Sequence, residues 1–209
     1  MTDLDQLPAT RTTLLTLRGE LDNAGQGHAI LERKREALLR ELRDLLRQVN
    51  HAERDVRERF DLAYKVQREA RITMGRDAMG FAGLAPAAQT DYSVESRTVM
   101  GVALPLVALS VERLPFPYSP GGIHPVFDEL CVRWIEVGKA LGPWSEMIGS
   151  IRMVADELQR TQRLVNALES ILIPRYQAAI RRIQAILEEQ ERESFSRTKR
   201  VKQHGQWRV

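Results

Sequence analysis

The side chains best suited to catalysis or metal binding in this 209-residue chain are few and scattered. The single cysteine, Cys131, stands in an apolar stretch typical of a buried thiol. Asp128 and Glu129 are adjacent, and adjacent residues of a helix do not face each other. The sequence has no Cys/His cluster with metal-ligand spacing, and its four histidines, His28, His51, His124 and His204, are scattered along the chain. The chain also lacks the glycine-rich phosphate-binding and dinucleotide-binding motifs. We therefore expect no catalytic residues, no metal site and no cofactor.

Composition indicates long solvated helices. Charged residues make up 28% of the chain and aromatic residues only 6%, and 28 acidic residues are interspersed among 31 basic ones. The formal net charge of +3 is mildly basic, so nucleic-acid binding stays open as an alternative, with charged helix faces the preferred interpretation.

The chain shows no features of membrane insertion or secretion. A lone cysteine excludes an internal disulfide and fits a reducing compartment. The most apolar run, at 99–111, is shorter than the roughly 20 residues that cross a bilayer, and Pro105 interrupts it. The first residues have no secretory-signal layout. We expect a cytoplasmic protein without direct membrane insertion.

Two long helices explain most of the apolar pattern. In the first half, apolar residues recur at alternating three- and four-residue spacing, which predicts a coiled-coil helix over 11–73, with Thr10 or Thr12 capping its start and Gly75 marking its end. A second series predicts a helix over 125–202. Its rows run from Trp134 through Ile148, Gln162 and Glu169 to Ile183, and from Val137 through Val165 to Ile186.

The predicted fold class is mainly α: a long antiparallel two-helix coiled coil formed by the N- and C-terminal helices. We expect one elongated domain over 1–209, with a middle segment at 74–124 and a flexible tail at 203–209. Residues 92–112 are strand-like and contain Gly101 and Pro105, which predicts a short β-hairpin. Proline and glycine predict a loop at 114–122.

Pro174 stands in the middle of the second helical pattern. Proline in a helix interior removes a hydrogen bond and clashes with the preceding turn, at a cost of roughly 3 kcal/mol. The apolar period continues on both sides, through Tyr176, Ala179 and Ile183. We therefore expect Pro174 to bend the helix rather than end it.

Three segments together resemble the D subunit of the V/A-type ATPases, the central stalk component of these complexes. They are an opening with Gly27-His28, Leu31 and Lys34-Arg35; a middle patch at 96–105 containing Met100-Gly101-Val102; and the most specific segment, which combines Asn166-Ala167-Leu168-Glu169 with Ile173-Pro174-Arg175. The matches occur in family order and span nearly the whole chain.

The resemblance implies a non-catalytic axle of a rotary ATPase or ATP synthase, which couples ATP hydrolysis or synthesis to ion translocation by rotation. The implied partners are the catalytic and non-catalytic ring subunits (A and B type), the small F subunit of the stalk, and the funnel-shaped subunit above the membrane rotor ring. The protein would then be peripheral to the membrane through the complex, with no nucleic-acid partner.

The resemblance also implies candidate interaction residues. They are Lys34, Arg35, Met100, Gly101, Val102, Asn166, Glu169, Pro174, Arg175, Arg197, Lys199 and Arg200. The ordinary alternative is a solvated helix face for Asn166 and the basic residues, and a structural role in a strand for Met100-Gly101-Val102. The alternative function is a generic coiled-coil scaffold or tether, with the basic C-terminal cluster as a candidate contact for nucleic acid.

Overall fold

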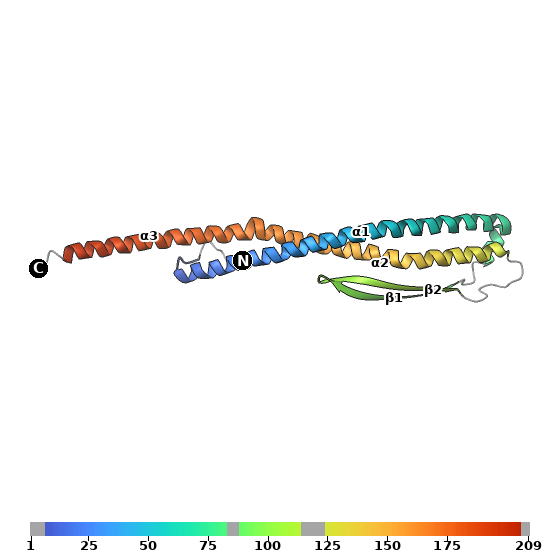
Figure 1. Cartoon of the computed structure of the whole chain (residues 1–209), viewed down its shortest axis with the longest axis horizontal. Coiled ribbons are helices and arrows are strands. Elements are labelled where there is room, and N and C mark those ends of the chain that lie inside the picture. The colour runs from blue at the N-terminus through green and yellow to red at the C-terminus, as the bar shows by residue number, and fades with distance from the viewer. Residues whose placement is uncertain (1–6, 83–87, 114–123, 206–209) are drawn as a thin grey trace. The chain divides into compact units, whose positions relative to one another are not determined.

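The computed structural model describes residues 7–82, 88–113 and 124–205 (Figure 1). Its elements are helix α1 (Arg11–Ala82), strands β1 (Ala88–Val99) and β2 (Val102–Arg113), helix α2 (Pro125–Ala167), the π-helical turn η2 (Leu168–Leu172) and helix α3 (Ile173–Gly205). This confirms the predicted mainly α class, with long terminal helices and a hairpin between them. The expected loop at 114–122 and the last residues of the expected tail, 206–209, lie outside the described residues.

The chain divides into two compact units, which we describe separately. The terminal unit contains Met1–Glu36 and Gln159–Val209, and the central unit contains Ala37–Leu158. The single elongated domain expected from the sequence stays a prediction.

Helix α1 begins at the predicted cap and continues past its predicted end. The Thr10 hydroxyl accepts a hydrogen bond from the Thr13 N–H at 3.1 Å, which satisfies a free amide of the first turn. Gly75 adopts φ 80° and ψ 168°, a conformation almost restricted to glycine, so it does interrupt the helix. A further helical segment then reaches Ala82, rather than the helix stopping near residue 73. It forms because Met79 and Ala82 pack into an apolar cluster of the central unit.

In the terminal unit, the start of α1 packs antiparallel against the last part of the chain. Arg11 pairs with Glu191, His28 lies near Glu169, and Arg35 contacts Gln162. The residue number of the partner therefore decreases as the residue number along α1 increases. The buried cluster of this unit is formed by Leu17, Ala179, Ile180 and Ile183.

The central unit also packs α1 antiparallel to α2, and it adds the hairpin. Phe60 and Tyr64 of α1 meet Trp134 of α2 edge-on, with ring centroids 5.8 and 5.5 Å apart. One buried cluster joins α1 and α2 through Val66, Ala70, Ala82, Phe127, Leu130 and Cys131. A second buried cluster includes β2 and consists of Leu38, Leu45, Val102, Leu104 and Val154.

The two strands form an antiparallel hairpin whose register runs from Ala88 opposite Arg113 to Val99 opposite Val102. Met100 and Gly101 form the two-residue turn with φ of 51° and 81°. Positive φ at both positions is the type I′ geometry that matches the twist of a hairpin. Pro105 fits inside β2, opposite Ser96, because a two-stranded sheet consists only of edge strands.

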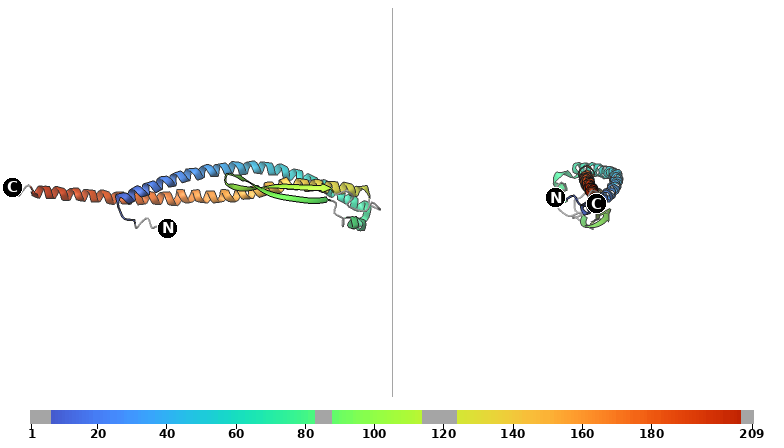
Figure 2. Two further views of the ribbon diagram at one scale, coloured as in Figure 1. Left: turned by 90° about the horizontal axis from the view of Figure 1, so that it is seen from below. Right: turned by 90° about the vertical axis from the view of Figure 1, so that its left-hand side faces the viewer.

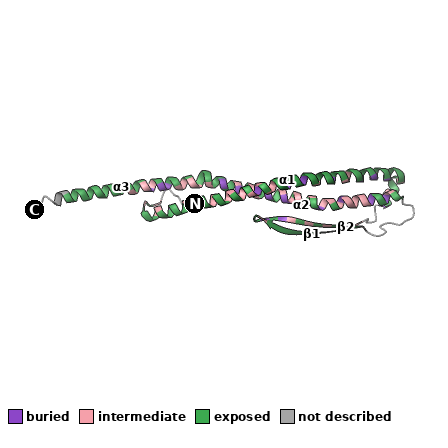
Figure 3. Ribbon diagram, in the orientation of Figure 1, coloured by how far each residue is buried: buried purple, intermediate pink, exposed green. Residues whose placement is uncertain are grey.

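Glycines on α2 allow β2 to approach closely, and the hairpin lies alongside that helix (Figure 2). A methyl group added at Gly142 would stand 2.9 Å from Leu109 Cβ, and one at Gly149 would stand 3.0 Å from Pro105 Cγ. The Val107 N–H also donates to Glu146 Oε2 at 3.0 Å. Strand β1 is exposed along its inner length, so β2 makes the contact with the helix (Figure 3).

Candidate partner-binding surfaces

The described residues contain no group of three or more histidine, cysteine, aspartate or glutamate side chains placed to hold a metal ion. Among those residues, no helix combines the length and apolarity needed to cross a membrane.

The most specific sequence segment lies on a π-helical turn. Asn166 and Ala167 end α2, Glu169 lies within η2, and Pro174 is the second residue of α3. The Ile173 N–H donates to the Leu168 carbonyl, five residues back rather than four. The helical path thus continues across Pro174, which bears out the expectation that proline does not end the helix. The wider turn shifts the hydrogen-bonding frame just where proline supplies no N–H.

Residues of this segment face outward to different extents. Asn166 and Pro174 are exposed, and the Glu169 side chain is 69% exposed, whereas Arg175 is half-buried. The Asn166 side-chain oxygen accepts a hydrogen bond from Gln162 Nε2 at 2.7 Å. The structure thus places Asn166 and Glu169 about one helical turn apart, both exposed.

A polar layer interrupts the apolar seam next to this surface. The Arg35 guanidinium donates to Gln162 Oε1 at 3.4 Å and to Glu32 at 3.2 Å. His28 Nε2 stands 4.0 Å from a Glu169 carboxylate oxygen. Arg35, predicted as a contact for a partner, therefore directs its charge to groups within the terminal unit, and its neighbour Lys34 is half-buried. Gln162 and Glu169 in the predicted seam were the sequence signal for this layer.

The hairpin turn presents only part of its predicted patch. Met100 is 55% exposed and Gly101 is exposed, but Val102 is buried among Leu38, Leu45 and other side chains of its cluster. Val102 therefore stabilises the hairpin, while the turn itself is open to contact.

The end of α3 is a wholly exposed stretch of helix, from residue 188 to residue 202 (Figure 3). Arg197 pairs with Glu193 of the preceding turn at 3.1 Å, and Lys199 and Arg200 are exposed nearby. Phe195 and Val201 are also exposed in this stretch. The predicted basic cluster thus lies on an uncovered helix with apolar side chains among its charges.

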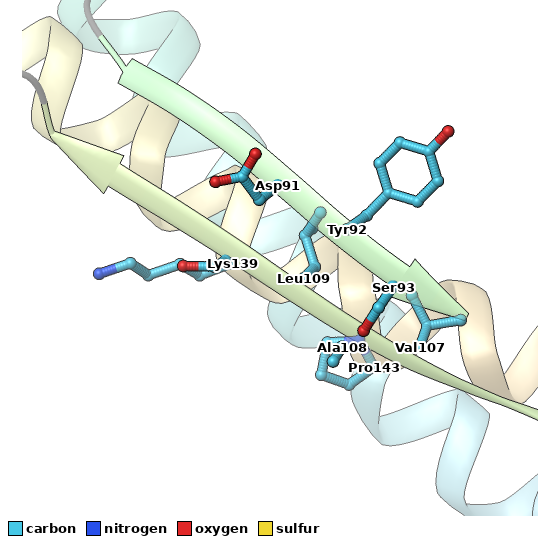
Figure 4. A pocket seen from close by; sticks show the side chains of 9 residues that line it. Asp91, Tyr92, Ser93, Val107, Ala108, Leu109, Lys139 and Pro143 are labelled. Carbon is cyan, nitrogen blue, oxygen red and sulfur yellow. The ribbon is translucent and has the colours of Figure 1, made fainter. Parts of the chain in front are cut away.

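Sequence reasoning missed the contact between the hairpin and α2. An open hollow beside this contact is lined by Tyr92 and Leu109 of the hairpin together with Lys139 and Pro143 of α2 (Figure 4). Gly138, Gly142 and Gly149 line the same helix, and their spacing in an otherwise apolar pattern was the available signal. Glu146 gave no recognisable signal, because its carboxylate acts on a backbone N–H brought close only by folding.

Tyr176 should make stability fall at high pH. Partial burial, followed by the charge of Glu20 and a hydrogen bond to it, raises the pKa of Tyr176. The folded state then holds the phenolic proton more tightly than the unfolded chain, whose tyrosine pKa is about 10. The stabilisation is complete below that pH and is lost as pH rises through the higher folded pKa. Urea unfolding at rising pH should show a smaller loss for Tyr176→Phe than for the unsubstituted chain. An identical pH dependence of the two proteins would contradict this.

Pro174→Ala should leave the helix intact and raise the melting temperature of the isolated chain. Alanine supplies an amide hydrogen that proline lacks, and it favours helix, for a gain of about 1 kcal/mol. Circular dichroism melting provides the measurement, with the exposed Gln177→Ala of the same helix as a control. A clearly lowered melting temperature would show that the proline itself stabilises the turn.

Comparison with known proteins places the chain in a family. The family model for the D subunit of ATP synthase matches residues 13–203. The chain belongs to the ATP synthase D-subunit family. The A-type ATP synthase D subunit of Methanosphaera stadtmanae is 33% identical over 204 residues, covering 96% of this chain and 95% of that protein.

Other members of the D-subunit family are similar over comparable lengths. The A-type ATP synthase D subunit of Methanopyrus kandleri is 32% identical over 95% of this chain and 87% of its own length. The V-type ATP synthase D subunit of Clostridioides difficile is 30% identical over 92% of this chain and 88% of its own length. The resemblance inferred from the sequence segments is therefore confirmed at family level, for both A-type and V-type relatives.

Proposed function

We propose that this chain is the central rotor axle of a V/A-type rotary ATPase or ATP synthase. The family match over residues 13–203 is the observation that carries the proposal. The antiparallel packing within each unit supports it, since paired helices resist twisting and bending better than one helix alone.

In this role the chain performs no bond chemistry of its own. It couples ATP hydrolysis or synthesis in a surrounding ring of catalytic and non-catalytic subunits (A and B type) to ion translocation. A shaft whose sides differ contacts each catalytic interface differently, so the interfaces differ in nucleotide affinity at any moment. Turning the shaft then changes which interface binds tightly, because a contact that favours one state shifts the equilibrium toward it.

The exposed surfaces fit such a role. The uncovered end of α3 and the π-helical turn offer contacts for the ring. The hairpin with its exposed Met100-Gly101 turn offers contacts for the small F subunit of the stalk and for the funnel-shaped subunit above the membrane rotor ring. The chain would then work in the cytoplasm, peripheral to the membrane through the complex.

Co-purification tests this proposal. Tagged chain expressed at its native level should recover two large nucleotide-binding subunits and a small F-like subunit. Recovery of none of these would overturn the proposal. Recovery of nucleic acid instead, with affinity that falls steeply as salt rises, would favour the scaffold alternative and its basic helix end.

A further inference from the structure

The π-helical turn redirects the amide that would usually pair with the backbone carbonyl of Glu169. A carbonyl in this part of the chain can accept from the amide four or five residues onward. Four residues onward, the Ile173 N–H already donates to Leu168, and five residues onward, Pro174 has no N–H. All of these residues are described, so neither of the two amides that usually pair with such a carbonyl is available to Glu169 alone.

The same residue also carries an accessible carboxylate. The Glu169 side chain is 69% exposed, and within the described part of the chain its ion pair is with His28, whose Nε2 lies 4.0 Å away. That distance is too long for a hydrogen bond. Glu169 therefore presents two acceptors, one neutral and one negative, on a single exposed residue of η2.

Water can satisfy both acceptors while the chain is free, but not after a partner covers them. A buried acceptor without a donor costs about 1–3 kcal/mol, and a buried charge costs more. A partner that covers this turn therefore has to bring donors and a positive charge.

We propose that Glu169 binds an arginine side chain of the surrounding ring, through its carboxylate and its backbone carbonyl together. The inference rests on the proposed axle function, because it assumes that a ring encloses this part of the chain. Arginine fits better than lysine because its planar guanidinium holds several N–H donors in a fixed fork and can donate to two acceptors at once. Asn166 adds little to this site, since its side-chain oxygen is already bonded to Gln162.

Two substitutions in the full chain test the contributions of the carboxylate and of the carbonyl individually. Glu169→Gln keeps the shape of the side chain and removes its charge, and Pro174→Ala supplies an amide that competes for the Glu169 carbonyl. The matched control is Glu36→Gln, which makes the same charge change at an exposed position of the terminal unit outside the π-helical turn and the end of α3. The probe is the purified ring of the nucleotide-binding subunits that co-purify with the chain.

We expect Glu169→Gln to weaken binding to this ring by roughly 10- to 100-fold, as for the loss of a hydrogen bond to a charged group. Pro174→Ala should weaken it by a smaller factor, and the double variant by less than the product of the two factors, because both changes act on one arginine. Glu36→Gln should bind within about twofold of the unsubstituted chain. Melting temperatures of the free variants check that each one remains folded.

The possible results distinguish a failure of the arginine contact from a failure of the proposed axle function. If the unsubstituted chain binds the ring and Glu169→Gln binds as tightly as Glu36→Gln, the arginine contact is wrong and the axle proposal stands. If Glu169→Gln weakens binding to the ring but the fold-loss of the double variant equals the product of the two single fold-losses, the two acceptors do not share one arginine. If the unsubstituted chain does not bind the ring at all, the axle proposal and this inference both fail.

Discussion

Replacing Gly142 with leucine should detach the β-hairpin from α2. Even a methyl group at this position would stand 2.9 Å from Leu109 Cβ, closer than such carbon atoms approach in proteins. Leu109 Cβ is fixed to the strand backbone and cannot rotate away, so either β2 or α2 has to move. Overpacking of this kind costs about 1–3 kcal/mol, and a two-stranded hairpin has little stability of its own to resist it.

Amide hydrogen exchange measures this detachment directly. Amides of β1 and β2 in Gly142→Leu should exchange faster than in the unsubstituted chain, while amides around Leu17 and Ile183 in the terminal unit should be unchanged. Gly19→Leu is the matched control, because a side chain at Gly19 meets nothing within 4 Å. That control should keep the hairpin protected and gain slightly in helix propensity. Unchanged protection of the hairpin in Gly142→Leu would contradict the close contact.

Ile183→Ala should cause the largest loss of stability in the terminal unit. Ile183 is 0% exposed and packs with Leu17, Ala179 and Ile180. Removing its outer carbons loses their burial and leaves a cavity, at a cost of about 2–5 kcal/mol.

A second substitution one helical turn away provides the comparison. Ile186, at 39% exposure on the same helix, should lose at most about 1 kcal/mol when replaced by alanine. Urea unfolding of both variants yields the difference in unfolding free energy. Similar losses for the two variants would show that the seam does not run through Ile183.

The seam of α1 could be predicted from the sequence because a long helix that buries one stripe has a strict apolar period. Leu17, Leu38, Leu45, Val56 and Ala63 follow the predicted spacing and are all buried. The apolar period is regular because charged side chains occupy the other faces of the helix, where they face solvent.

The seam of α2 could be predicted only in part. Ile148 was expected on the seam and is exposed, while Ser150 and Val154 lay outside the predicted rows and are buried. The physical reason is that α2 contacts both α1 and the hairpin, so it buries a wider surface than a two-helix seam requires. The sequence of α2 gives no sign of its contact with the hairpin except its glycines. The glycines alone do not indicate that β2 packs against them.

The π-helical turn could not be predicted from the sequence, although the position of an irregularity in the helix could. Pro174 marked an irregularity, and the apolar period across it indicated a continuing helix. Whether a helix accommodates proline by bending or by widening one turn depends on how Ala179 and Ile183 have to align with α1 to stay buried. That alignment is a property of the packed helices and not of the segment itself.

Rotation of this chain inside its complex is the decisive test of the axle proposal. The ring of nucleotide-binding subunits would be fixed to a surface, and a bead attached to a single thiol at the exposed hairpin turn, by Met100→Cys in a Cys131→Ala background. We predict that the bead turns continuously in one direction when ATP is supplied and stops when ATP is removed. A bead that stays still while the same complex hydrolyses ATP would contradict the proposal.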